Sequence, residues 1–303
     1  PWWDRAGAPV DLVVLQATVQ QGRHEFEPAR RLLADVVARA PDHAQAWLDL
    51  AALARLEANY PAALRACDAV ARAGASLYAQ ACQLETLSLQ GRHAQATQGL
   101  QRLLDGSQEA GPRSWLFSLL AESLERAGRD TLALEAYRSS LAAQHDLYTA
   151  VAFSDLLLRS AQPELALQLL EPLPQTDAVV LRRAYALRRL GDGRWMALRA
   201  ELRSRSAELR RRGDNTDLHA REAALVALWL DEDPQQALAL ARRNLELQRE
   251  PLDWWIALHS AQQAGDDAAW RALDQQRKAI GLHDMRLEPS NAAARQRRAK
   301  DMS

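Results

Sequence analysis

Apolar and small residues recur at intervals of three and four along most of the 303-residue chain, which is the spacing of one helix face. The segment that begins at Trp47 is an example, because Leu50, Ala51 and Ala54 follow at the third, fourth and seventh positions after it. Ala, Leu, Arg, Gln and Glu dominate the composition, whereas β-branched residues and glycine are sparse. The pattern and the composition together predict an all-α fold.

A second, longer period groups these helices into units. A turn, then a small residue, then an apolar helix recur at intervals of 34, 33, 37 and 33 residues, and again 71 residues on, which is two periods. The small residues of this series are Ala29, Ala63, Ala96, Ala133, Ala166 and Ala237. Each helix pair can bury its apolar face only against its neighbours, so we expect one continuous core along a repeat array.

Within a unit, the pattern resembles the tetratricopeptide repeat, a helix–turn–helix with recurring aromatic, leucine, small and turn positions. The second unit carries it at Trp47, Leu50, Ala51, Ala54, Tyr60, Ala63 and Leu64, and the fourth at Phe117, Leu120, Ala121, Leu124, Gly128, Ala133 and Tyr137. The first, third and sixth units depart from it. The resemblance implies a right-handed α-solenoid of about eight antiparallel helix pairs over residues 11–280. A lead segment at 1–10 would precede it, and a polar, disordered tail at 281–303 would follow.

Charge and motif content argue against several classes of function. The formal net charge is −1, so no global field draws the chain to nucleic acid or to an anionic membrane. No apolar stretch approaches the roughly 20 residues that span a bilayer. The sequence contains no Gly-rich phosphate loop, no GxSxG elbow and no HExxH motif, and its seven histidines include no i, i+4 pair. We therefore expect no enzymatic activity, no metal site and no cofactor.

The resemblance also implies a ligand groove, because the first helix of each pair lines the concave face of such arrays. On three adjacent units an aromatic residue precedes a carboxylate by seven positions, which is two helical turns. The pairs are Tyr78 with Glu85, Trp115 with Glu122, and Tyr148 with Asp155. An extended peptide with Arg or Lys beside apolar residues would suit this series. In the alternative, the aromatic rings pack between helices and the carboxylates are only solvated.

One stretch of the chain is strongly basic. Residues 182–212 contain eleven arginines and three carboxylates, a balance of +8, and the series begins with Arg182, Arg183, Arg188 and Arg189. Such a patch could meet an acidic protein, an anionic polysaccharide or a phosphate backbone. The arginines occur at all helical phases, however, so a long solvated helix that continues to about Arg212 is the alternative.

The two cysteines, Cys67 and Cys82, flank a Gly74-Ala75 turn symmetrically. Two antiparallel helices joined at this turn would place them at the same height, where a disulfide could form. The alternative is that both are free thiols packed as small core residues, as buried cysteine often is.

A non-catalytic adaptor that binds a segment of a partner protein in its concave groove is the function that the resemblance implies. Bacterial arrays of this type commonly serve envelope complex assembly, so an envelope-associated or periplasmic location and a cytoplasmic one are both retained. The chain begins at Pro1 without a methionine, so we expect a segment upstream of it. The alternative is therefore a regulatory or sensory module of a longer chain.

Overall fold

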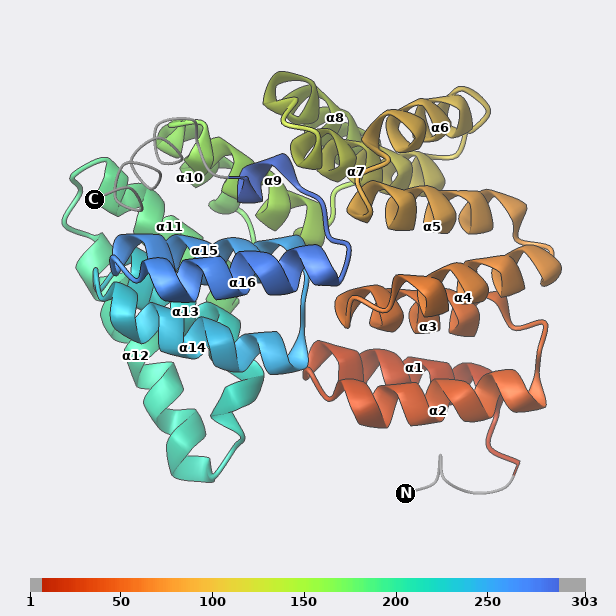
Figure 1. The fold of residues 1–303 in the computed structure, drawn as a ribbon, viewed down its shortest axis with the longest axis horizontal. Coiled ribbons are helices and arrows are strands. Elements are labelled where there is room, and N and C mark those ends of the chain that lie inside the picture. Colours follow the sequence, from red (N-terminus) through yellow and green to blue (C-terminus); the bar gives the residue numbers. More distant parts are fainter. Residues whose placement is uncertain (1–6, 289–303) are drawn as a thin grey trace.

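The computed structural model describes residues 7–288, and this span contains sixteen α-helices and two short 3₁₀ turns (Figure 1). The prediction of an all-α chain of about eight helix pairs is confirmed. The elements are α1 (Val10–Gly22), α2 (Phe26–Arg39), α3 (Ala44–Leu56), α4 (Tyr60–Arg72), α5 (Ser76–Leu89), α6 (His93–Asp105), α7 (Ala110–Arg126), α8 (Asp130–Ala143), α9 (Leu147–Arg159), α10 (Pro163–Leu170), α11 (Asp177–Arg189), α12 (Trp195–Arg212), η2 (Thr216–His219), α13 (Ala220–Trp229), α14 (Pro234–Leu247), α15 (Pro251–Gln263), α16 (Asp267–Ala279) and η3 (Met285–Leu287).

Helix α4 shows how the sequence sets the ends of these helices. The side chain of Asn59 accepts a hydrogen bond from the amide of Ala62 at 3.2 Å, which satisfies one of the free N–H groups of the first turn. Pro61 occupies the first turn, where its missing N–H costs nothing. Gly74, with φ +85°, then reverses the chain toward α5. Side chains of His43, Asp146, Thr176, Asp233 and Asp266 cap the first turns of α3, α9, α11, α14 and α16 in the same way.

The alanine series of the sequence lies where the two helices of a pair pack together. All six of its members are fully buried: Ala29, Ala63, Ala96, Ala133, Ala166 and Ala237. A small side chain at these positions lets the two helices approach closely, so that their leucines and aromatic rings interdigitate. The 33–37-residue spacing of alanine is therefore the repeat of the helix pairs themselves.

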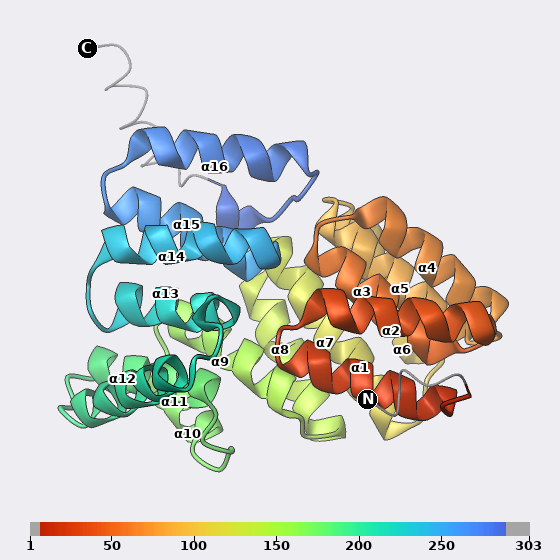
Figure 2. The same ribbon diagram turned by 90° about the horizontal axis from the view of Figure 1, so that it is seen from below.

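Consecutive pairs stack side by side, and the first helices of neighbouring pairs also touch. Such contacts join α3 to α5, α5 to α7, α9 to α11, α11 to α13, and α13 to α15. The first helices therefore form one layer of the array and the second helices the other. The stack does not run straight: it curves over α7–α10 and returns, so that α15 and α16 lie near the units where the chain began (Figures 1 and 2).

Three contacts close this curve. The amide of Arg249, between α14 and α15, donates to the carbonyl of Leu56 at the end of α3, at 2.7 Å. The amide of His283 donates to the carbonyl of Leu89 at the end of α5, at 2.8 Å. The Arg286 side chain donates to Glu125 on α7, at 2.7 Å. The connection between α14 and α15 is thus attached to the second unit, and the end of the described chain to the third and fourth.

We call residues 282–288 the clasp. Leu282 and Leu287 are 0% and 4% exposed, and they share one apolar cluster with Tyr60 and Leu89. The sequence predicts a disordered tail from residue 281, but the described part of that tail is packed, because these two leucines bury against units far away in the sequence. The remainder of the predicted tail, 289–303, and residues 1–6 of the predicted lead segment lie outside the described residues.

Cys67 on α4 and Cys82 on α5 form a disulfide, with their Cα atoms 5.7 Å apart. Both residues are buried, at 0% and 1% exposure, beside Ala51 and Ala66. Of the two alternatives that the sequence left open, the structure therefore contains the bonded one. The bond links the second helix of one unit to the first helix of the next.

Candidate groove on the concave face

The six groove residues expected from the sequence lie on the first helices α5, α7 and α9. Their aromatic members contact their neighbours within the chain. The rings of Tyr78 and Trp115 lie 5.5 Å apart, and the Tyr148 hydroxyl donates to Glu122 at 2.7 Å. Two contacts therefore join neighbouring units, one between Tyr78 and Trp115 and the other between Tyr148 and Glu122. That it contacts a partner stays a prediction.

The three carboxylates of this ladder are engaged by groups of the same chain. Glu85 pairs with Arg55 at 2.9 Å, and Asp155 receives two hydrogen bonds from Arg182, at 2.6 and 2.7 Å. Burial raises the pKa of Glu122 even though a neighbouring arginine opposes that rise. Each of these carboxylates already pairs with an arginine of the same chain, so it is less available to bind an Arg or Lys of a partner than the sequence suggested.

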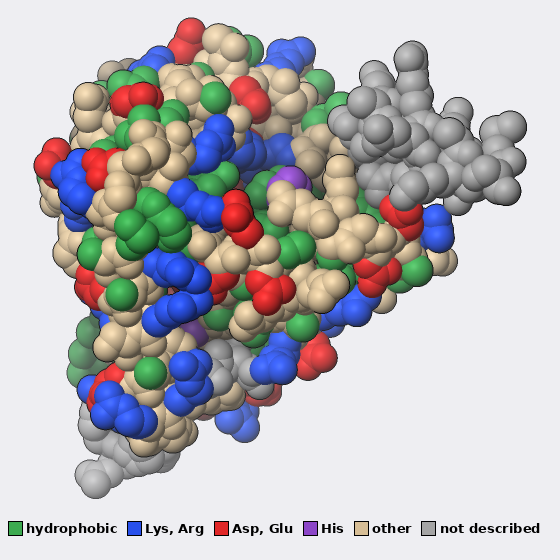
Figure 3. All heavy atoms as spheres, turned by 90° about the vertical axis from the view of Figure 1, so that its left-hand side faces the viewer, with side chains coloured by type: hydrophobic (Ala, Val, Ile, Leu, Met, Phe, Trp, Pro, Cys, Tyr) green, Lys and Arg blue, Asp and Glu red, His purple; other side chains and the backbone are tan. Residues whose placement is uncertain are grey.

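The basic segment does not form one patch. Arg182 is buried, at 3% exposure, against Asp155, and Arg183 donates to the side chain of Gln175 at 2.8 Å. The arginines of α12 pair largely with acidic residues, as Arg199 does with Asp231 at 2.5 Å. Figure 3, which faces the side of the molecule that carries α12, shows Lys and Arg side chains interspersed with Asp and Glu. As the sequence alternative held, α12 is one long helix that ends at Arg212.

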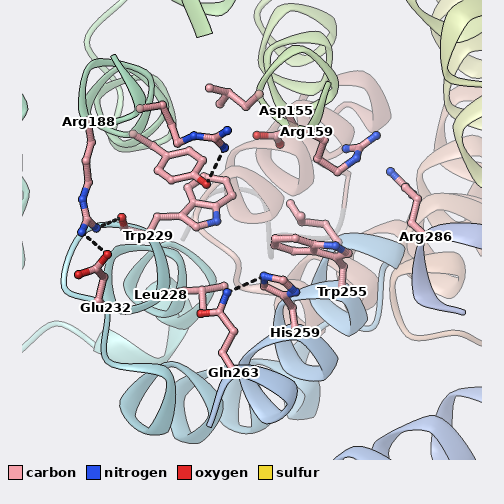
Figure 4. Close-up of a pocket in the computed structure, with 14 residues that line it drawn as sticks. Asp155, Arg159, Arg188, Leu228, Trp229, Glu232, Trp255, His259, Gln263 and Arg286 are labelled. Carbon is pink, nitrogen blue, oxygen red and sulfur yellow. Dashed lines mark hydrogen bonds and ion pairs between the residues drawn. The ribbon is translucent and has the colours of Figure 1, made fainter. Parts of the chain in front are cut away.

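Arg188 and Arg189 instead lie at a cavity of about 550 Å³, formed by the first helices α9, α11, α13 and α15 together with the clasp (Figure 4). The lining residues are Asp155, Leu158, Arg159, Tyr185, Arg188, Arg189, Leu228, Trp229, Glu232, Leu252, Trp255, His259, Gln263 and Arg286. A volume of this size is in the range of ligand sites in proteins. The cavity involves units five to eight, further along the array than the groove expected from the sequence.

Aromatic rings form a continuous row in this cavity. Tyr185 on α11 stacks on Trp229 of α13, with centroids 4.5 Å apart and planes 12° from parallel. Trp229 in turn lies 6.4 Å from Trp255 on α15, and Trp255 stacks on His259 at 4.7 Å. All four side chains are only partly buried. Burial lowers the pKa of His259, so its ring is neutral at pH 7.

Four arginines edge the row, and they differ in how fully they are neutralised. Arg188 pairs with Glu232 at 2.5 Å and also donates to the carbonyl of Trp229. Arg159 and Arg286 donate to one and the same oxygen, Oε2 of Glu125, at 2.6 and 2.7 Å, and lie together on one side of the cavity (Figure 4).

Arg189 differs from the other three. Its guanidinium donates to the Tyr185 hydroxyl at 3.4 Å and lies 5.8 Å from the centre of that ring. Among the side chains of residues 7–215 and 218–288, no carboxylate forms an ion pair with it. The rim therefore holds positive charge in excess of the carboxylates that line it.

No protein-family model and no curated protein matches the sequence. Solved structures do. A tetratricopeptide repeat protein from Parabacteroides merdae is 9% identical over 89% of this chain and 98% of its own, with a TM-score of 0.45. The structure of Pseudomonas aeruginosa pilF is 19% identical over 67% of this chain and 90% of its own, at 0.43. A chain of the Cut9–Hcn1 hetero-tetramer of the APC/C is 16% identical over 83% of this chain and 49% of its own, with a TM-score of 0.47. The chain is an all-α solenoid that resembles tetratricopeptide repeat proteins.

None of the four residues of the aromatic row was among the groove residues predicted from the sequence. Trp255 directly follows Trp254, which is buried at 2% exposure. Neighbouring residues on a helix point about 100° apart, so Trp255 does not share the buried face of Trp254, and its ring lines the cavity instead. The same reasoning applied to Tyr185 and Trp229 would have moved the expected groove to the later units.

Two further properties of the described solenoid bear on function. Among the side chains of residues 7–215 and 218–288, no group of three or more from His, Cys, Asp or Glu is arranged to hold a metal ion. None of the helices in that span combines the length and the apolar character needed to cross a bilayer.

Proposed function

We propose that this solenoid is a non-catalytic interaction scaffold, and that it holds a segment of a partner protein in the cavity on the concave face of α9, α11, α13 and α15. The observation that carries the proposal is the row of Tyr185, Trp229, Trp255 and His259, whose partly exposed rings line an open cavity without being covered by the chain itself. Aromatic side chains in such positions contribute large contact areas at low entropic cost, and they dominate many protein interfaces.

The scaffold around the row supports a recognition role because it is rigid. Trp229 and Trp255 lie on helices that a buried network joins: Arg221 of α13 donates to Asp253 of α15 at 2.7 and 2.8 Å. Asn244 of α14 donates to the same carboxylate at 2.6 Å. Sites built on helices that are fixed in this way keep their geometry on binding.

The disulfide supports a location for this activity. Disulfides persist in oxidising compartments such as the bacterial periplasm and are rare in the cytosol. The Cys67–Cys82 bond therefore favours action in the bacterial envelope, where a scaffold would help to assemble a complex.

A random-peptide display library offered to the intact chain tests the proposal. We expect enriched peptides that bind with micromolar or better affinity in fluorescence polarisation, and that lose about tenfold or more of that affinity to Trp229→Leu and Trp255→Leu. Trp47→Leu is the matched control, since Trp47 is also a partly exposed tryptophan on a first helix but lies outside the cavity. The proposal is wrong if no peptide is enriched, or if all three variants bind equally well.

A further inference from the structure

The charge at the cavity rim indicates the chemistry of its occupant. Four arginines line the cavity, against the two carboxylates of Asp155 and Glu232. Asp155 is held by Arg182 behind the wall, so it neutralises none of the four rim arginines. Glu232 forms an ion pair with Arg188. Of the other three rim arginines, Arg159 and Arg286 share Glu125, and Arg286 also binds Asp284. Arg189 forms no ion pair with a carboxylate among the described side chains.

The N–H donors that remain can be counted from the contacts. A guanidinium has five N–H donors. Arg189 uses one, on the Tyr185 hydroxyl, and Arg159 uses one, on Glu125. Arg286 is the most committed, because it binds both Glu125 and Asp284. Arg159 and Arg189, on α9 and α11, are therefore the groups best able to take a new carboxylate in a bidentate arrangement.

From this rim and the row beside it, and resting on the proposed function, we infer that the occupant is an extended acidic peptide segment. Its Asp or Glu side chains bind Arg189 and Arg159, and its aromatic or large aliphatic side chains pack on Tyr185, Trp229 and Trp255.

The dimensions of the row fit a short segment. Tyr185, Trp229 and Trp255 belong to the first helices of three successive units. Packed helices are spaced by about 8–10 Å, so three of them span roughly 16–20 Å. An extended chain advances about 3.3 Å per residue, and the row therefore accommodates about five or six residues. Alternate side chains of such a segment point to the same face, so an alternation of acidic and apolar residues places one set on the rings and the other on the arginines.

A peptide fits the cavity better than a single-stranded nucleic acid does. A nucleic-acid backbone carries a charge at every residue, and grooves that bind it are basic along their whole length. Here Glu232, whose side chain is 74% exposed, lies on the rim, and the chain as a whole has a formal net charge of −1. Discrete carboxylates of a peptide can meet Arg189 and Arg159 while apolar residues pass Glu232.

The composition of the peptides selected from the random display library tests the inference separately from the proposed function. We expect the enriched sequences to carry at least two Asp or Glu residues together with an aromatic or large aliphatic residue within a window of about six. Enriched sequences that are neutral or basic would overturn the inference and leave the scaffold proposal standing. Failure to enrich any peptide would refute both.

Charge reversal at the rim provides the second test, with one enriched acidic peptide as the probe. Arg189→Glu should weaken its binding by about tenfold or more, and raising the salt concentration should weaken binding to the wild type. Arg138→Glu, an exposed arginine of α8 outside the cavity, is the control and should change affinity by less than about twofold. Equal affinities for the two variants would contradict the assignment. So would displacement of the peptide by a 15-nucleotide oligo-dT at a lower concentration than unlabelled peptide requires.

Discussion

Arg286→Met should open the clasp while the rest of the solenoid stays folded. Methionine replaces the unbranched methylene stem of the arginine with one of similar length, and the guanidinium is lost. That group donates to Glu125 at 2.7 Å and to Asp284 at 2.5–3.1 Å. Both carboxylates are buried, with side-chain exposures of 3% and 0%, so the loss leaves them with less positive charge in a dry environment.

The size of the effect follows from these exposures. Removing one partner of a fully buried ion pair costs about 3–5 kcal/mol. The Arg286 side chain is 22% exposed, and Glu125 keeps Arg159 and the hydroxyl of Tyr137, so we expect a smaller loss, of about 2 kcal/mol. Each 1.4 kcal/mol is a factor of ten, so the opening equilibrium of the clasp should shift about 30-fold.

Hydrogen exchange of the His283 amide is the measurement, because this amide donates to the carbonyl of Leu89 and is exposed to exchange when the clasp opens. It should exchange about 30-fold faster in Arg286→Met. Arg194→Met is the matched control: Arg194 forms a comparable pair with Asp192 at 2.7 Å, but on the surface. Exchange at His283 that is unchanged, or equal in the two variants, would refute the reasoning.

The same clasp should respond to acid. Burial is the largest single influence and would raise the pKa of Asp284, but the charge and the hydrogen bonds of Arg286, together with the charge of Arg126, outweigh burial and hold the pKa below its ordinary value of 3.8. A carboxylate with a lowered folded-state pKa contributes stability that is complete above the unfolded value and is lost as the pH falls through the folded one. The clasp of the wild-type protein should therefore keep its protection down to about pH 4 and lose it only below that value.

Three other expectations can be checked by urea unfolding. Reduction of the disulfide, which closes a 15-residue separation, should lower the free energy of unfolding by about 3 kcal/mol, and an unchanged midpoint would contradict this. Gly91→Ala should destabilise more than Gly74→Ala. Both glycines have φ +85°, but only at Gly91 would the new Cβ meet the clasp, at 2.9 Å from Cβ of His283. Equal losses in the free energy of unfolding for the two variants would contradict the position of the clasp beside Gly91. His259→Gln should make the free energy of unfolding less dependent on pH. Burial lowers the pKa of His259, so its contribution to stability is complete at pH values above the unfolded pKa of 6.5 and decreases as the pH falls below 6.5. Parallel pH profiles of the variant and the wild type would rule this out.

The helix pairs and their repeat could be predicted from the sequence because both are local properties. Ala63, Ala133 and Ala166 mark helix contacts within a window of about 34 residues, and each is fully buried in the structure. The placement of Tyr78, Trp115 and Tyr148 on the first helices of neighbouring units was also predictable, since they lie at matching positions of the repeat. What the spacing did not contain was the identity of their partners within the chain.

The closure of the array and the position of the cavity could not be predicted in this way. Arg249 and Glu57, which share a hydrogen bond, are separated by 192 residues, and Arg286 and Glu125 by 161. Such contacts depend on the sum of small rotations between successive units, and an error of a few degrees per unit would separate these residues by many ångströms. The neutralisation of Asp155 by Arg182 was missed for a related reason, because a count of charges along the segment cannot tell an internal ion pair from a free surface charge.

The clasp also sets an order for events on the ribosome. At about 5–20 residues per second, the 161 residues that separate Glu125 from Arg286 take roughly 8–32 s to synthesise. The first four units can stack as they emerge, since each needs only its neighbour. During that interval the surfaces around Leu89 and Glu125 have no clasp to cover them. The nascent chain therefore presents, for many seconds, a site that the finished protein closes with its own residues 282–288.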